Sequence, residues 1–140
     1  MGTSSMTVTF TRVQQLEELS SKYKQIQPLL KKALTKAPEY NEEAVLAKVL
    51  NGTSQMWLAE DDELLGITIT EGVQYPEYLA LNIHLLGGTR LKEWMEIGLE
   101  KIQQFAKDSG CKEISLSGRK GWEKLLKDFT ATRTILTKRL

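Results

Sequence analysis

The chain has 140 residues, 41% of them apolar and 26% charged, and its formal net charge at pH 7 is +1. This length fits one domain with a sizeable core, and no apolar run reaches the roughly 20 residues of a membrane span. One cysteine and one histidine exclude an internal disulfide and a structural Cys/His zinc site. We expect a cytoplasmic protein without a membrane segment or metal: residues 1–5 are a cloning remnant or disordered, and 6–140 form a single domain.

The charges are unevenly distributed along the chain. Residues 112–140 hold eight Lys or Arg against three Asp or Glu, whereas the residues before them hold eleven against fifteen. A basic C-terminal end is compatible with a phosphate-bearing ligand, an acidic protein or nucleic acid, and equally with a solvated charged rim. The charge distribution alone therefore does not identify the class of partner.

The first part of the chain predicts a strand and two helices. Alternation over residues 7–12 is typical of a strand, and apolar residues at helical spacing from Val13 to Ile26 predict a helix. Pro28 predicts that this helix kinks or restarts. Asn41 followed by two glutamates predicts an N-cap, and Asn51-Gly52 predicts the end of this second helix after Leu50.

The middle of the chain predicts three strands. Residues 55–60 and 64–71 read as a hairpin, in which Leu65, Ile67 and Ile69 share one face. Thr68 and Thr70 share the other, which is the half-buried pattern of an antiparallel sheet. Residues 79–86 predict the next strand, and we expect both of its faces to be buried. Strict alternation predicts that one of its faces carries Leu79, Leu81, Ile83 and Leu85, and the other Ala80, Asn82, His84 and Leu86.

The last part predicts a parallel crossover. An apolar stripe from Arg90 to Ser109 predicts a helix, and residues 111–117 predict a strand that lies parallel to strand 79–86. A short helix over 122–129 and a final strand over 133–138 follow. The fold class is therefore α/β (α+β), with a mixed, mostly antiparallel sheet.

Two glycines join the central strand to its helix. Backbone N–H groups at a helix start lack partners, and the helix dipole favours negative charge there, so Gly87-Gly88 predicts an anion pocket. A tight turn that lets the helix pack closely is the equally weighted alternative. Arg90, placed in the first helical turn where its charge opposes the dipole, favours an anionic ligand.

Several single residues have both a chemical and a structural interpretation. His84 has a suitable pKa for a general base, although a lone histidine on an apolar strand is more often a packing residue. Glu60 and Glu71, at strand ends, could accept a proton through water, or simply be solvated. For the remaining candidates we favour structural roles: Cys111 as an inert thiol, and Trp94 and Trp122 as core residues.

The order of elements resembles the GCN5-related N-acetyltransferase (GNAT) fold, with helices on both faces of the sheet. The resemblance spans nearly the whole chain from residue 6 and is carried by three segments: Trp57–Glu60 with Leu65-Gly66, Leu81–Trp94, and Trp122–Phe129 with Ile135–Lys138. More narrowly, the sequence resembles small GNAT-like proteins encoded by tailed bacteriophages. That match rests on Gly87-Gly88-x-Arg90-x-x-Glu93-Trp94 and on Gly118-Arg119-Lys120-Gly121-Trp122.

The resemblance implies acetyl-coenzyme A, or another acyl-CoA, as co-substrate, bound where the fourth and fifth strands diverge. Its pantetheine arm would lie beside Asn82, Ile83 and His84. The implied phosphate contacts are Gly87, Gly88, Thr89 and Arg90, with Arg119 and Lys120 attracting the nucleotide phosphate.

The sequence departs from the family pattern in two places. The usual phosphate loop, Arg/Gln-x-x-Gly-x-Gly/Ala, is shortened here, and its arginine follows the glycines. The tyrosine that often protonates the leaving thiolate falls at Lys124, and a lysine needs a lowered pKa for that role.

Two hypotheses follow from these observations. The first is a GNAT-type N-acetyltransferase in which Glu60 or His84 deprotonates a small-molecule or protein amine through water, a backbone N–H near Ile83 holds the oxyanion, and water or Lys124 protonates the thiolate. The second is a catalytically idle module, in a host cytoplasm or virion if phage-encoded, that acts by binding a protein partner. A homo-oligomer is compatible with both hypotheses. Nucleic-acid binding by the basic end is a weaker third idea, and we do not expect it.

Overall fold

Eight helices and strands make up the part of the chain that the computed structural model describes, which is residues 7–116, 126, 128–132 and 136–140. In chain order they are β1 (Thr9–Arg12), α1 (Leu16–Leu34), α2 (Glu42–Leu50), β2 (Ser54–Glu60), β3 (Leu64–Gln74), β4 (Leu79–Gly88), α3 (Leu91–Asp108) and β5 (Glu113–Leu116).

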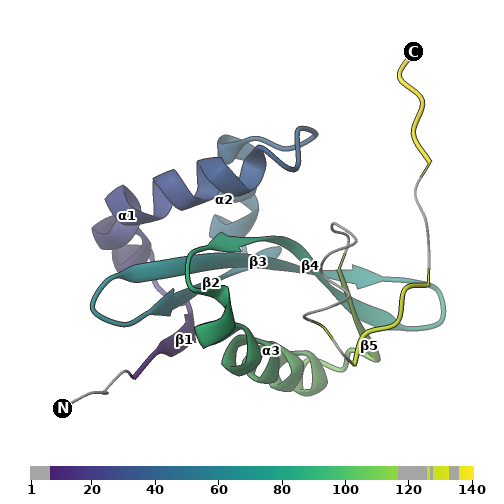
Figure 1. Cartoon of the computed structure of the whole chain (residues 1–140). Coiled ribbons are helices and arrows are strands. Elements are labelled where there is room, and N and C mark those ends of the chain that lie inside the picture. Colours follow the sequence, from purple (N-terminus) through teal and green to yellow (C-terminus); the bar gives the residue numbers. More distant parts are fainter. Residues whose placement is uncertain (1–6, 117–125, 127, 133–135) are drawn as a thin grey trace.

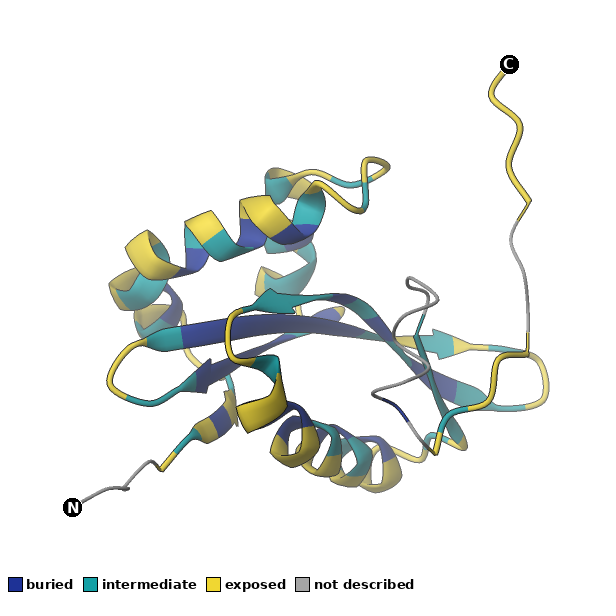
Figure 2. Ribbon diagram, viewed as in Figure 1, coloured by how far each residue is buried: buried dark blue, intermediate teal, exposed yellow. Residues whose placement is uncertain are grey.

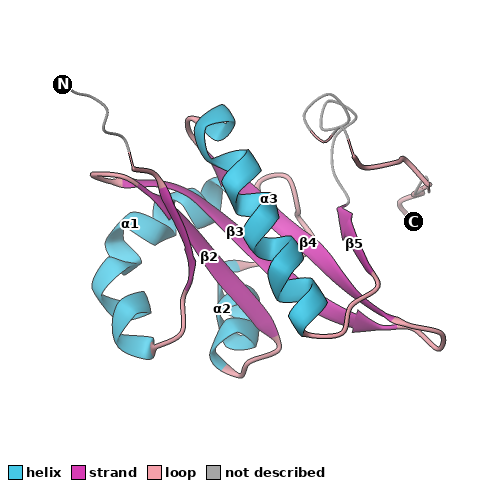
Figure 3. Cartoon of the chain, turned by 90° about the horizontal axis from the view of Figure 1, so that it is seen from below, coloured by secondary structure: helices cyan, strands magenta, loops and turns pink. Residues whose placement is uncertain are grey.

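The strands form one sheet in the order β1-β2-β3-β4-β5. Neighbouring strands are antiparallel except β4 and β5. These two strands, which α3 connects along the chain, run parallel as predicted. Helices α1 and α2 cover one face of the sheet and α3 covers the other, which Figure 1 and the view from below in Figure 3 both show. The mixed, mostly antiparallel fold class with helices on both faces is confirmed.

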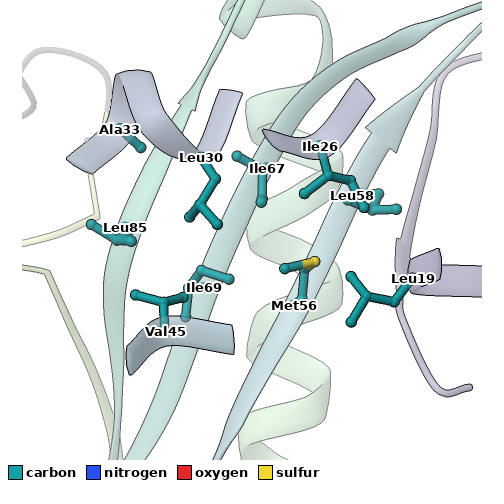
Figure 4. Packing of buried hydrophobic residues seen from close by; sticks show 10 residues of the cluster. All are labelled: Leu19, Ile26, Leu30, Ala33, Val45, Met56, Leu58, Ile67, Ile69 and Leu85. Atoms are coloured by element: carbon teal, nitrogen blue, oxygen red, sulfur yellow. The ribbon is translucent and has the colours of Figure 1, made fainter. Parts of the chain in front are cut away.

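Each face of the sheet has its own apolar core, and most of β2 and β3 between them is buried (Figure 2). On the α3 face, Phe10 stacks between Trp57 and Trp94 with ring centroids 5.6 and 6.0 Å apart. Thr68 and Thr70 of β3 also point to this face and are fully buried, so the half-buried hairpin that the sequence predicts is wrong. The core under α1 and α2 (Figure 4) contains Leu19, Ile26, Leu30, Ala33, Val45, Met56, Leu58, Ile67, Ile69 and Leu85.

A β-bulge in β4 reverses the alternation of its side chains. Ile83 pairs with Thr70 and Leu85 pairs with Ile69, so His84 is the extra residue. Leu81 consequently packs in the α3 core, whereas Leu85 packs under α1 and α2. The prediction that Leu81 and Leu85 share a face is wrong, because one inserted residue shifts the two-residue period of a strand.

A second irregularity lies at the start of β3. Ala59 pairs with Gly66 and Glu60 pairs with Leu64, which leaves Leu65 as the extra residue. Leu65 belongs to the α3 core, whereas Ile67 and Ile69 lie on the opposite face, against the sequence prediction.

The helix boundaries follow local sequence signals. The Asn41 side chain accepts a hydrogen bond from the Ala44 N–H at 2.8 Å, which confirms the N-cap of α2. Asn51 is the C-cap, and Gly52 follows it at a φ of +85°. Helix α1 does not restart at Pro28, which lies inside one continuous helix.

The C-terminal predictions are tested only in part. Leu126 is buried and Phe129 partly buried, but most of the predicted helix over 122–129 falls outside the described residues. The predicted last strand is wrong over residues 136–138: Leu136–Leu140 form no regular element, and Leu136 is 90% exposed. These residues lead away from the sheet in Figure 1. No helix in the described part of the chain has the length and apolar character needed to cross a membrane.

Candidate functional site

Among the described residues, strand β4 pairs with its parallel neighbour only up to the point where it bulges. Pairing with β5 runs from Ala80 opposite Glu113 to Ile83 opposite Leu116. Beyond Ile83, β4 continues through His84 to Gly88 with no β5 partner among the described residues. A bulge also disrupts the regular ladder of a strand. This edge of β4 can therefore offer backbone groups to a ligand.

Four polar residues lie side by side on the α1/α2 face, one on each of four neighbouring strands. The strand register places Ser54 opposite Glu71, Glu71 opposite Asn82, and Asn82 opposite Ser115. We call these four residues the polar row. The Ser54 hydroxyl donates to Glu71 Oε1 at 3.1 Å, and the Ser115 hydroxyl donates to Asn82 Oδ1 at 3.3 Å.

His84 adjoins the polar row through Asn82. Asn82 Nδ2 lies 3.3 Å from His84 Nδ1, and the Tyr40 ring packs edge-on against the imidazole with centroids 4.3 Å apart. His84 Nε2 is buried, and it has no hydrogen-bond partner within the described part of the chain. Burial lowers the pKa of His84 below its usual value near 6.5, so the ring is neutral at pH 7.

A small pocket lies beside His84 between α2 and the sheet. Its volume of about 20 Å³ holds one water molecule but not a substrate. On one side of it, Lys48 Nζ lies 3.2 and 3.4 Å from the two carboxylate oxygens of Glu71. The residues that line the pocket are Tyr40, Ala44, Val45, Lys48, Ser54, Ile69 and His84. A larger ligand must therefore approach along the β4 edge rather than through this pocket.

The glycines of the expected phosphate loop are part of β4. Gly87 pairs with Ile67 and Gly88 with Gly66, and the Thr89 N–H donates to the Leu65 carbonyl at 2.8 Å. The Thr89 amide is thus already hydrogen-bonded to the protein. Gly88, at a φ of +143°, lies against the backbone of β3, which supports the tight-packing interpretation of this glycine.

Arg90 is bound by two carboxylates. It is the left-handed N-cap of α3, with a φ of 54°, rather than a residue of the first turn as the sequence predicts. Its Nη1 donates to Asp61 Oδ2 at 2.6 Å, and its Nε and Nη2 donate to Glu93 at 2.6 and 2.8 Å. Two carboxylates and one guanidinium leave this ion cluster with a formal charge of −1.

The pKa shifts of the ion cluster agree with its geometry. Hydrogen bonds to Glu93 and then Asp61 raise the pKa of Arg90, and Arg90 lowers the pKa of Glu93. The pKa of Asp61 is lowered mainly by the Glu63 backbone N–H and then by Arg90. Asp61 and Glu93 were missed by reasoning from the sequence. The Arg90–Glu93 spacing of three residues was the available signal.

The predicted catalytic carboxylate, Glu60, does not lie near His84. Glu60 pairs with Leu64, six positions along β3 from Thr70 at the bulge, which corresponds to about 20 Å. Its carboxylate is held by Lys22 at 2.9 Å. Glu71, the other strand-end glutamate, is the carboxylate that the fold brings next to Asn82.

The remaining predicted residues divide into described and undescribed ones. Trp94 is buried, and its Nε1 donates to the Thr89 carbonyl, which confirms its core role. Burial raises the pKa of the half-buried Cys111 thiol. Among the described residues, no cluster of three or more His, Cys, Asp or Glu side chains could hold a metal. The candidates Arg119, Lys120, Trp122 and Lys124 lie outside the described residues.

Comparison with solved structures identifies the fold. A GNAT family acetyltransferase from Staphylococcus aureus has a TM-score of 0.69 at 17% identity, with 96% of this chain and 100% of that chain covered. A predicted acetyltransferase from Clostridium acetobutylicum, solved with acetyl-CoA, has a TM-score of 0.70 at 13% identity, covering 95% and 96%. The aminoglycoside N-acetyltransferase AAC(6')-Iy in complex with CoA has a TM-score of 0.74 at 12% identity, covering 100% and 99%.

The chain therefore has the fold of the GNAT acetyltransferases over nearly its whole length. No protein-family model matches the sequence, and no curated protein sequence matches it. At these identities the likeness defines the architecture, and the activity has to be argued from the site itself.

Proposed function

We propose that the chain is an acyl-CoA-dependent N-acyltransferase that moves an acetyl group to an amine of a small molecule or a protein. The observation that carries this proposal is the edge of β4, which bulges at His84 beside the polar row and has no β5 partner beyond Ile83 among the described residues. Solved structures with this fold include complexes with acetyl-CoA and with CoA, which is why we favour this class of co-substrate.

In this proposal the β4 edge binds the pantetheine arm of the co-substrate. Backbone groups of His84 and of the β4 residues beyond it would pair with its amides, as a further strand would, because Asn82 and Ile83 pair with β5. The diphosphate would lie at the start of α3, against the Leu91 and Lys92 amides, which no carbonyl of the helix can pair. Of the sequence candidates for this end, Gly87, Gly88 and Thr89 contribute shape rather than free amides, and Arg119 and Lys120 remain candidates for the nucleotide phosphate.

The proposed reaction forms a C–N bond between the acceptor amine and the acyl carbon while the C–S bond to coenzyme A breaks. Glu71 would accept the proton that the amine loses, through a bridging water, because it pairs with Asn82 next to the bulge, whereas Glu60 lies far along β3 from it. A backbone N–H near Ile83 would hold the oxyanion. The departing thiolate would take its proton from water or from Lys124.

The ion cluster at Arg90 gives this proposal a quantitative test. With a formal charge of −1, the cluster repels a diphosphate at the start of α3. Replacing Glu93 by Gln removes one carboxylate and frees part of the guanidinium. We expect calorimetry to show micromolar binding of acetyl-CoA by the natural sequence and about five- to tenfold tighter binding by Glu93→Gln.

Glu96→Gln is the matched control for this experiment. Glu96 lies one turn further along α3, is exposed, and loses the same charge on substitution. It should change the dissociation constant by less than about twofold because solvent and salt screen its more distant charge. Equal effects of the two variants would contradict a diphosphate at the start of α3.

One observation favours the second hypothesis, a catalytically idle GNAT-fold module that acts by protein contact, such as a phage-encoded one. The closed ion cluster and the engaged Thr89 amide leave fewer groups for a diphosphate than the family pattern implies. If neither the natural sequence nor Glu93→Gln binds acetyl-CoA at millimolar concentration, the transferase proposal is wrong. The catalytically idle module is then the remaining hypothesis.

A further inference from the structure

We propose that Asn82 is a positioning residue which, anchored by Ser115, holds His84 as the neutral tautomer protonated on Nε2. At the proposed site, which this inference takes from the proposed function, His84 is then a hydrogen-bond donor, through one water molecule, to an oxygen of the bound substrate and not a general base. The assignment differs from both sequence-based interpretations of His84, which are a general base and a packing residue.

The first step is the orientation of the Asn82 side chain. The register of β4 and β5 places Asn82 directly opposite Ser115. The Ser115 hydroxyl donates to Asn82 Oδ1 at 3.3 Å, so the carboxamide oxygen faces β5. The amide nitrogen therefore faces along β4 toward His84, where Nδ2 lies 3.3 Å from the ring Nδ1.

The second step is the position of the imidazole proton. A carboxamide NH₂ group can only donate, so the ring Nδ1 beside it has to present its lone pair. A neutral imidazole carries one proton, which must then be on Nε2. An imidazolium would place two donors against each other at Nδ1.

The charged groups around His84 do not reverse this assignment. Lys48 of α2 disfavours the imidazolium, whereas Glu71 of β3 and Glu39 of the α1–α2 connection favour it. Burial is the largest influence, and the pKa of His84 is lowered overall. The neutral ring is therefore the form present at pH 7 and above.

The third step is the consequence for chemistry. Both ring nitrogens are committed, since Nδ1 accepts from Asn82 and Nε2 carries the proton, so no lone pair is left to take a proton from an amine. The buried Nε2–H has no hydrogen-bond partner among the described residues. Because the pocket beside His84 holds one water molecule and not a substrate, this donor is suited to reach a substrate oxygen through that water.

The single histidine makes the tautomer directly observable by NMR. In a long-range ¹H–¹⁵N spectrum of the untagged, ¹⁵N-labelled chain at pH 7.5, every imidazole signal belongs to His84. We expect a protonated Nε2 and an unprotonated Nδ1. A protonated Nδ1, or an imidazolium, in the natural sequence would overturn the proposal.

Substitutions at Asn82 test its role in holding the tautomer. Asn82→Asp replaces the donor by a carboxylate, which accepts from Nδ1–H, so the protonated nitrogen should change to Nδ1. Asn82→Ala should give a mixture of both tautomers. Asn51→Ala, in which an asparagine away from the site is truncated, serves as the folding control and should leave the His84 signals unchanged. Identical His84 signals in all three variants would contradict a positioning role for Asn82.

Activity distinguishes a donor from a base once acyl transfer can be measured. A glutamine amide can place an N–H near the position of Nε2, and an asparagine amide near that of Nδ1. We expect His84→Asn to lose at least about ten times more activity than His84→Gln, since removing one such donor costs about 100-fold in rate. Equal loss in both variants would overturn the donor role. Because the tautomer is read without ligand, a failure to bind acetyl-CoA would remove the proposed function and leave this assignment standing.

Discussion

Gly88 lies at the end of β4, against β3, in a backbone conformation that residues with a side chain rarely adopt. A Cβ atom at this position would lie 2.2 Å from the Leu65 carbonyl oxygen and 2.5 Å from the Gly66 Cα. Both atoms belong to backbone that is fixed by strand pairing, so neither can move aside as a flexible side chain would. Glycine is required here by the approach of two strands, independently of any ligand.

Replacing Gly88 by alanine should lower the free energy of unfolding by about 3 kcal/mol or more, because the clash adds to the strain of a positive φ. Gly87→Ala is the neighbouring control. Its Cβ would lie 3.4 Å from the Ala33 Cβ, an ordinary contact, and the expected loss is below about 1 kcal/mol. Urea unfolding followed by circular dichroism measures both, and similar losses would show that the backbone clash is relieved.

At the scale of the helices and strands, local signals were sufficient for most elements. The apolar spacing of α1, the cap at Asn41 and the strand–helix–strand order around α3 each depend on residues close in sequence, and each was predicted. The bulges at Leu65 and His84 were not, because a bulge is defined by the register with a partner strand. A sequence read one strand at a time carries no information on that register.

The same limit explains what was missed at the site. The choice between Glu60 and Glu71 depends on which residues of β3 lie opposite the bulge in β4. The pairing of Arg90 with Asp61 joins residues 29 positions apart. The family resemblance implies Asn82 and His84 as site residues, and both lie on one strand, whereas Ser115, which anchors Asn82, comes from another strand.

Pro28 is an element-scale feature that can be tested by stability. It lies exposed inside α1, where it lacks an N–H and its ring interferes with the preceding turn. We expect Pro28→Ala to raise the free energy of unfolding by about 1–3 kcal/mol, since alanine restores the helical hydrogen bond without loss of packing. Gln25→Ala, at an exposed position one turn earlier, should change it by less than about 0.5 kcal/mol. No gain at Pro28 would mean that the chain beyond it depends on a kink.

At the scale of the whole molecule, one sheet is shared by two cores. Leu30 of α1 and Ile102 of α3 are both fully buried, and they belong to the two different cores. Their side chains therefore pack against opposite faces of the same sheet. Neither helical layer can keep its core if the sheet is lost. The chain should therefore unfold as one cooperative unit.

Tryptophan fluorescence offers a test of this cooperativity, because Trp57 and Trp94 both lie on the α3 face. In a Trp122→Phe background these two residues are the fluorescent reporters. Leu30→Ala and Ile102→Ala should each lower the free energy of unfolding by about 2–5 kcal/mol. Both should shift the fluorescence midpoint and the circular-dichroism midpoint together. If Leu30→Ala shifts circular dichroism alone, the α1/α2 layer unfolds separately.

Because His84 is an extra residue in β4, deletion of one codon could remove the proposed hydrogen-bond donor and keep the architecture. Because Ile83 and Leu85 already pair with consecutive residues of β3, deleting the His84 codon would leave an evenly alternating strand with every other side chain on its present face. Descendants with such a deletion would retain both cores and lack the imidazole. Among natural variants of this protein, the length of this strand would separate chains that can carry the proposed site from those that cannot.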